Sequence, residues 1–174
     1  ALAALVLGTT IFFIIFIVGA GFAFAAMALV STANMEDDAT KIRRITRMAL
    51  WLSLAFGLLV SPVFVFSEWL LLLLGQEVKL AALASDYLFF SGIAMIPALS
   101  SSVLRCYLAG MEYVKITFYV SIIAVLLNLL INYLLVFGMF GMPELGIIGA
   151  GIATIFVNFF MFVSFLIYAK IQLP

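Results

Sequence analysis

Residues 116–143 read ITFYVSIIAVLLNLLINYLLVFGMFGMP, an uncharged and mostly apolar run. A helix needs about 20 such residues to cross about 30 Å of hydrocarbon, so this run predicts a membrane-spanning helix. The rest of the chain has the same character, since 68% of its residues are hydrophobic and 9% are charged. Soluble domains are about half apolar and about a quarter charged. The predicted fold class is therefore an all-α, polytopic transmembrane helix bundle.

Four further apolar runs are long enough to span the bilayer, or nearly so, and short polar connections separate them. The predicted spans cover about residues 2–31, 48–70, 87–107, 116–138 and 146–169. The connection at 36–47 differs from the others, because acidic residues come first, basic residues follow, and apolar residues recur at helical spacing. We predict an amphipathic cytoplasmic segment that lies on the inner leaflet, or a solvated elbow that sets the topology.

Two prolines fall inside predicted spans, Pro62 in the second and Pro97 in the third. A proline bends a membrane helix and leaves one backbone carbonyl without its N–H partner. The serines at 100–102 follow Pro97 and could satisfy the carbonyl that it frees. Small residues crowd the start of the fifth span and predict a helix-packing surface there; they are Gly146, Gly149, Ala150, Gly151 and Ala153.

The basic residues are divided unevenly between the two sides of the predicted bundle. All of them except Lys79 fall on the side that the positive-inside rule assigns to the cytoplasm. The first span would then start on the outer side, and Ala1 already stands inside an apolar run. We therefore expect residues 1–174 to be an internal fragment of a longer membrane protein.

Composition also excludes several functions. A net charge of zero and a pI of about 6.4 give no reason to expect nucleic-acid binding. Cys106 is the only cysteine and histidine is absent, which excludes an internal disulfide, Ser–His or Cys–His nucleophile pairs and imidazole metal sites within these residues. We predict no enzyme activity, no metal site and no cofactor; an intramembrane enzyme would have to rely on Ser, Thr, Tyr or this cysteine.

The polar residues within the spans are the candidate site. Asn128 and Asn132 share one face of the fourth span, and Thr154 and Asn158 share one face of the fifth, because each pair is spaced by four residues. An amide that faces lipid is costly, so both faces should point into the bundle. Two interpretations stay open for the first pair: hydrogen bonds that hold helices together, or a polar lining for an ion or substrate path. Packing is the favoured interpretation for Asn158.

Four ordered motifs resemble the multidrug and toxic compound extrusion (MATE) transporters, in their NorM-like bacterial branch. The motifs are LLGQEVKLAALASDYL (73–88), LRCYLAG (104–110), NLLINYLLVFG (128–138) and GMPELGIIGAGIAT (141–154). The family has twelve helices in two lobes, so the resemblance implies that residues 1–174 are helices two to six of the N-terminal lobe. The first helix and the C-terminal lobe of the same protein would then be its partners.

The resemblance also implies a function and a site. It implies an antiporter in a bacterial inner membrane that exports amphipathic or cationic drugs in exchange for Na⁺ or H⁺. An archaeal branch binds a cation through an Asp on helix one, an Asn and an Asp on helix five and a Thr on helix six. Asn128 matches that Asn, Thr154 matches the Thr, and Asn132 stands where the helix-five Asp would be. The loop after the first span also departs from the pattern of many members.

Two other functions remain possible at this point. A flippase for lipid-linked oligosaccharides belongs to the same superfamily, but it would need basic residues inside its cavity, and none falls mid-membrane here. A non-catalytic membrane assembly subunit is compatible with five helices.

The predicted topology can be tested with single cysteines at Lys41 and Lys79 in a cysteine-free, full-length background. The charge asymmetry places these residues on opposite sides of the membrane, so an impermeant maleimide should label Lys79→Cys in whole cells and spare Lys41→Cys. Equal labelling of the two positions would contradict the five-span assignment.

Overall fold

The computed structural model describes residues 2–138 and 145–172, which form helices joined by short turns. The helices are α1 (Leu2–Met35), α2 (Ala39–Val65), α3 (Ser67–Leu73), α4 (Val78–Gly110), α5 (Val114–Phe137) and α6 (Gly146–Gln172). All of them except α3 are long and apolar enough to cross a membrane. The predicted all-α bundle with five spans is confirmed. Part of the fourth motif, residues 141–144, lies outside the described residues.

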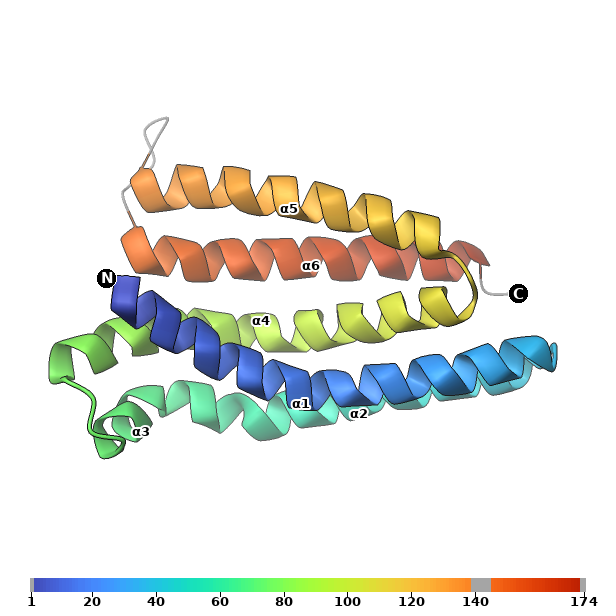
Figure 1. The fold of residues 1–174 in the computed structure, drawn as a ribbon, viewed down its shortest axis with the longest axis horizontal. Coiled ribbons are helices and arrows are strands. Elements are labelled where there is room, and N and C mark those ends of the chain that lie inside the picture. Colours follow the sequence, from blue (N-terminus) through green and yellow to red (C-terminus); the bar gives the residue numbers. More distant parts are fainter. Residues whose placement is uncertain (1, 139–144, 173–174) are drawn as a thin grey trace.

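Helix α4 lies at the centre of the bundle (Figure 1). It packs against α1 and α2 on one side and against α6 on the other, while α5 packs chiefly against α6. The α1–α2 turn, the α4–α5 turn and the end of α6 lie together at one end, and α3 lies at the opposite end. Because its neighbours surround α4, most of that helix is buried, whereas most of the surface of α5 is exposed.

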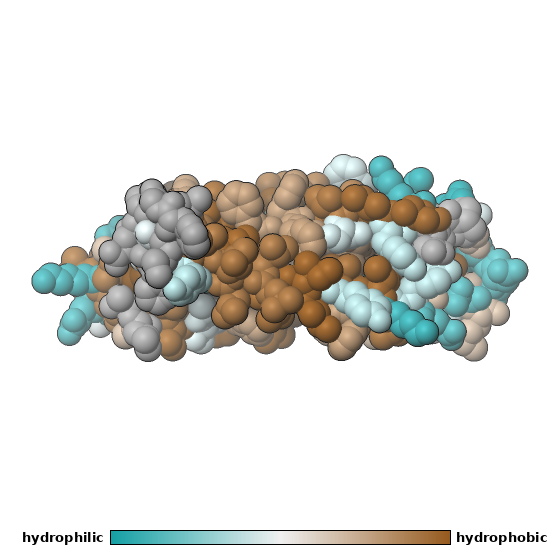
Figure 2. All heavy atoms as spheres, turned by 90° about the horizontal axis from the view of Figure 1, so that it is seen from above, coloured by the Kyte–Doolittle hydropathy of each residue, from teal (hydrophilic) through white to brown (hydrophobic). Residues whose placement is uncertain are grey.

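The surface has the pattern that a bilayer requires. Seen from the α5 side, a hydrophobic belt crosses the middle of the bundle and hydrophilic residues gather at its two ends (Figure 2). In hydrocarbon, every backbone polar group must be satisfied within the protein, and long helices do this without outside partners. The exposed apolar side chains are therefore compatible with contact to the lipid hydrocarbon of a bilayer.

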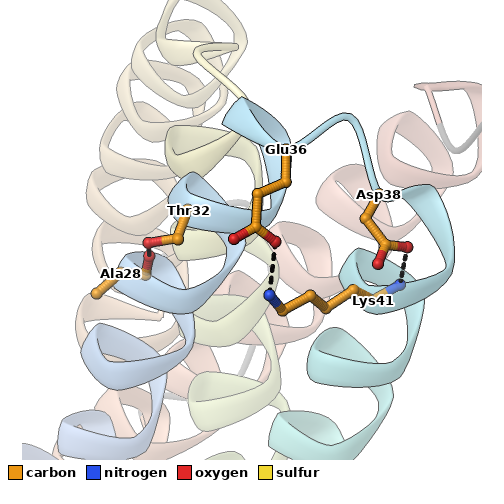
Figure 3. Close-up of polar contacts among 5 residues, drawn as sticks. All are labelled: Ala28, Thr32, Glu36, Asp38 and Lys41. Atoms are coloured by element: carbon orange, nitrogen blue, oxygen red, sulfur yellow. Dashed lines mark hydrogen bonds and ion pairs between the residues drawn. The ribbon is translucent and has the colours of Figure 1, made fainter.

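The connection predicted at 36–47 is a tight turn followed by the first turns of α2 (Figure 3). The Asp38 side chain caps α2 by accepting a hydrogen bond from the Lys41 backbone amide at 2.9 Å. The Lys41 ammonium donates to the Glu36 carboxylate at 2.6 Å. Because the cap and the ion pair fix this turn, the helix begins at Ala39 and runs without interruption into the predicted second span.

The predicted span 48–70 is divided at Phe66, where α2 ends and α3 follows. Four residues earlier, Pro62 has no N–H to donate to the Leu58 carbonyl. The Ser61 hydroxyl donates to that carbonyl instead, at 2.8 Å. The proline therefore leaves no orphaned carbonyl at this position, and the second crossing of the membrane is followed by a short separate helix.

Helix α4 begins well before the predicted start of its span at residue 87. Lys79 and Asp86 indicated a connection in the sequence, but both lie on exposed sides of helical turns. A charged side chain on an exposed side of a helix does not interrupt its backbone hydrogen bonds. The charged residues therefore mark the end of the apolar span and not the end of the helix.

The serine that follows Pro97 does not act as the sequence suggested. The Ser101 hydroxyl donates to the Ala98 carbonyl at 2.8 Å, one turn back along α4. The carbonyl that Pro97 deprives of a donor belongs to Ile93, which lies about 10 Å further toward the start of the helix than the first of the serines, at 1.5 Å per residue. The expectation that the serines at 100–102 satisfy that carbonyl is therefore wrong.

The small residues at the start of α6 form the close helix contacts predicted for them. A Cβ atom on Gly149 would lie 2.7 Å from the backbone oxygen of Leu135 on α5. A Cβ atom on Gly151 would lie 2.8 Å from the Phe90 side chain on α4. Glycine is thus required on two sides of α6 for its neighbours to approach this closely.

Replacing Gly149 with Ala should lower the free energy of unfolding by about 1–3 kcal/mol, because the backbone of α5 cannot yield to the added methyl group. Gly21→Ala is the matched control, since nothing lies within 4 Å of a Cβ atom at that position. Thermal unfolding of the full-length protein in detergent measures both variants. An unchanged Tm for Gly149→Ala would contradict the contact between α5 and α6.

Candidate functional site

The polar face predicted on the fourth span lies on α5. The Asn132 amide nitrogen donates to the Asn128 backbone oxygen at 2.9 Å and to the Asn128 side-chain oxygen at 3.0 Å. Both side chains are half-buried. These bonds leave the Asn132 side-chain oxygen and the Asn128 amide N–H groups without a hydrogen-bond partner among the described residues. Asn128 and Asn132 therefore form a linked pair that can still accept and donate.

The polar residues of α6 bond within their own helix. The Thr154 hydroxyl donates to the Ala150 carbonyl at 2.9 Å, and the Asn158 amide donates to the Thr154 carbonyl at 2.8 Å. Within the described ranges no hydrogen bond joins Thr154 to Asn128 or Asn132. The structure thus links two of the three predicted site residues directly and keeps the third on a separate helix.

Thr154 nevertheless lies at the same depth as the asparagine pair. Helices α5 and α6 run antiparallel and side by side (Figure 1). The close contact between Leu135 and Gly149 sets their register. Because both helices rise by the same amount per residue, counting five residues from that contact brings Thr154 level with Leu130, midway between the two asparagines.

At this depth in the bundle, neutral oxygen atoms of side chains are available as ligands for a cation. Carbonyl-type oxygens can replace part of the water shell of a cation, and they do so at the midplane of many transporters. The Asn132 side-chain oxygen and the Thr154 hydroxyl are the available groups here. In the described part of the chain, no three His, Cys, Asp or Glu side chains come together. The arrangement suits a path for a cation or a polar group of a substrate.

An open apolar groove of about 820 Å³ runs along the outer side of α5. The described residues that line it all belong to α5; they are Ile123, Leu126, Leu127, Leu129, Leu130, Asn132, Tyr133 and Val136. A groove of this kind is open to whatever lies beside the helix, whether lipid or another helix. Asn132 therefore lies at the boundary between the polar pair and an apolar surface that can bind the hydrophobic part of a ligand.

Two buried serines were not among the predicted residues. Ser53 on α2 and Ser91 on α4 are almost fully buried, and neither hydroxyl has a hydrogen-bond partner among the described residues. Ser91 precedes Gly92, where a Cβ atom would lie 2.6 Å from Phe64 on α2. The small size of Gly92 lets α2 and α4 approach closely there. Sequence spacing could have marked the two serines as small residues but gave no sign of their depth.

Membrane-length helices around a buried α4, with charged residues near both ends of the bundle, define a multi-pass α-helical membrane protein. The family model described as MatE matches residues 1–134. The chain belongs to the MatE family. The resemblance to the MATE transporters drawn from the four motifs is thereby confirmed.

Curated relatives agree with this assignment. The chain is 43% identical to a probable multidrug resistance protein NorM of Rhizobium meliloti (strain 1021), over 88% of this chain and 33% of the relative. A probable NorM of Agrobacterium fabrum is 40% identical, over 97% of this chain and 36% of that protein. The multidrug resistance protein PmpM of Pseudomonas aeruginosa is 36% identical with the same coverage. The chain thus spans about a third of the length of the relatives that it matches.

Proposed function

We propose that the chain forms part of a secondary antiporter that exports amphipathic or cationic drugs in exchange for Na⁺ or H⁺ across a bacterial inner membrane. Membership of the MatE family and the names of the relatives, all multidrug resistance proteins, support drug export. These names favour drugs over lipid-linked oligosaccharides as cargo, and a transporter over an assembly subunit.

The observation that carries the proposal is the linked pair on α5. An apolar helix exposed to lipid has no need of two adjoining amides, and burying or exposing them there costs free energy. The Asn132 side-chain oxygen stays available beside the apolar groove. An amphipathic cation needs both surfaces, a polar group for its charge and an apolar wall for its body. Thr154 adds a hydroxyl at the same depth.

The membrane potential supplies energy for such an exchange when one more positive charge moves inward than outward, as when one cation enters for each neutral drug molecule or two enter for each singly charged drug cation. One elementary charge that moves inward across about 100 mV releases about 2.3 kcal/mol. At about 1.4 kcal/mol for each tenfold change in concentration, this sustains a drug gradient of roughly 40-fold before any ion gradient contributes.

The variants Asn128→Ala and Asn132→Ala should reduce drug efflux by roughly tenfold, the effect of losing a contact worth about 1.4 kcal/mol. Val125→Ala is the matched control, because Val125 is an exposed apolar residue three positions before Asn128 on α5 and is not among the residues that line the apolar groove. The measurement is efflux from proteoliposomes of the full-length protein under imposed Na⁺ or pH gradients, normalised for reconstituted protein. Melting temperatures show whether the variants remain folded.

Asn132→Asp is the sharper variant, because it places a titratable carboxyl group on the transport path. Efflux by this variant should acquire a new pH dependence, different from that of the wild type, because the added carboxyl group must titrate. Wild-type efflux in all three variants, with no new pH dependence, would show that the pair only stabilises α5.

A further inference from the structure

A second groove lies at the opposite end of the bundle from α3, between α2 and α6. Both helices pack on α4, which forms the floor between them. One part of the groove, about 320 Å³, is lined by Arg43, Thr46, Arg47, Leu50, Leu104, Tyr107, Leu166, Ala169 and Lys170. An adjoining part, about 310 Å³, reaches further along the helices and shares Arg47, Leu50 and Leu166 with the first. The two parts form one continuous groove with a basic end and an apolar end.

Three cations line the basic end, and none of them has a carboxylate partner among the described residues. Arg43 and Arg47 are four residues apart and share one side of α2, while Lys170 lies in the last turn of α6. The one ion pair in the described part of the chain joins Lys41 to Glu36 at the nearby turn (Figure 3). The groove thus gathers positive charge from two helices without neutralising it.

A buried hydroxyl group at the same place also lacks a partner. Tyr107 on α4 lines the groove and is only 1% exposed, and its hydroxyl forms no hydrogen bond within the described residues. Leaving a buried hydroxyl unsatisfied costs free energy, so such a group usually has a partner. A bound oxygen anion in the groove would supply one for Tyr107 as well as for the cations.

The apolar part of the groove identifies the kind of anion. Beyond Arg47 the walls are mostly apolar, with Ser100 as the one polar residue besides Trp51 among the described lining residues, so they offer little to a small hydrated ion. The apolar residues are Leu50, Leu54, Ile96, Phe162 and Leu166. They suit a hydrocarbon chain, and Trp51 beside them is a side chain typical of the membrane interface. The positive-inside rule places this end in the cytoplasmic leaflet, and basic pockets between helices on that side suit anionic lipid headgroups.

We propose that this groove binds an anionic phospholipid, with its phosphate against Arg43, Arg47 and Lys170 and one acyl chain along the apolar walls. Arginine suits the phosphate because its planar guanidinium can donate two parallel hydrogen bonds. The bound lipid joins α2 to α6 at the cytoplasmic end, where both otherwise rest on α4. The site is separate from the polar pair on α5, so it does not depend on the proposed transport path.

Trp51 reports directly on occupancy of the groove. The full-length protein is reconstituted in phosphatidylcholine vesicles that contain increasing fractions of phosphatidylglycerol with brominated acyl chains, which quench tryptophan fluorescence on contact. Subtracting the signal of a Trp51→Phe variant isolates Trp51 from the other tryptophans. We expect quenching of Trp51 to saturate at a low fraction of brominated phosphatidylglycerol, and brominated phosphatidylcholine to quench only in proportion to its abundance.

The groove variant changes Arg43, Arg47 and Lys170 to Gln together, and the control makes the same change at Lys41, Arg105 and Lys115, which are exposed and line neither part of the groove. The groove variant should need a roughly tenfold higher fraction of phosphatidylglycerol, and the control should behave as wild type. Tyr107→Phe keeps the shape of the side chain and should weaken the preference for phosphatidylglycerol severalfold.

Three results would overturn the proposal. Equal quenching by the two brominated lipids in the wild type would show that the groove does not select an anion. Equal shifts in the groove and control variants, with Tyr107→Phe unchanged, would reduce the effect to general surface charge. Displacement of the brominated phosphatidylglycerol by millimolar inorganic phosphate would show that the groove binds a free anion in place of a lipid.

Discussion

The close packing of neighbouring helices against α4 is the interaction on which the rest of the structure depends. Lipid tails are as apolar as leucine, so helices in a bilayer gain little from hiding apolar surface and must gain from contact at short range. Small residues on α4, such as Ala84 and Ala94, are fully buried. Gly57 on α2 lies against Ile96 of α4, and Gly151 on α6 lies against Phe90. Gly8 on α1 lies against Tyr87 in the same way, so such contacts fix α1, α2 and α6 around one central helix.

The same arrangement explains where the two candidate sites lie. Helix α5 has little contact with α4 and rests mainly on α6, so its polar pair stays half-buried at the edge of the bundle (Figure 1). Helices α2 and α6 both rest on α4 from different sides, so a groove remains between them. The polar pair is accessible because α5 lies at the edge of the bundle, and the groove exists because α2 and α6 both pack on α4 and leave a space between them.

The sequence predicts the spans well because a bilayer imposes a minimum length of uncharged residues. It predicts the ends of the helices less well, since Asp86 on α4 and the charged residues Lys41, Arg43 and Arg44 on α2 lie in helical turns, on exposed sides. The bond between Asn128 and Asn132 follows from their spacing along one helix. The convergence of Arg43 with Lys170 does not, because it depends on how α2 and α6 pack on α4.

The central functional claim is that the polar face of α5 lines a path that water reaches. The most direct test is the reactivity of single cysteines with a hydrophilic methanethiosulfonate reagent in the full-length protein, after replacement of the buried Cys106. Cysteines at Asn128 and Asn132 should react much faster than one at Leu130, which lies at the same depth on the opposite side of α5. Equal rates at the three positions, or no reaction at the two asparagines, would contradict the claim.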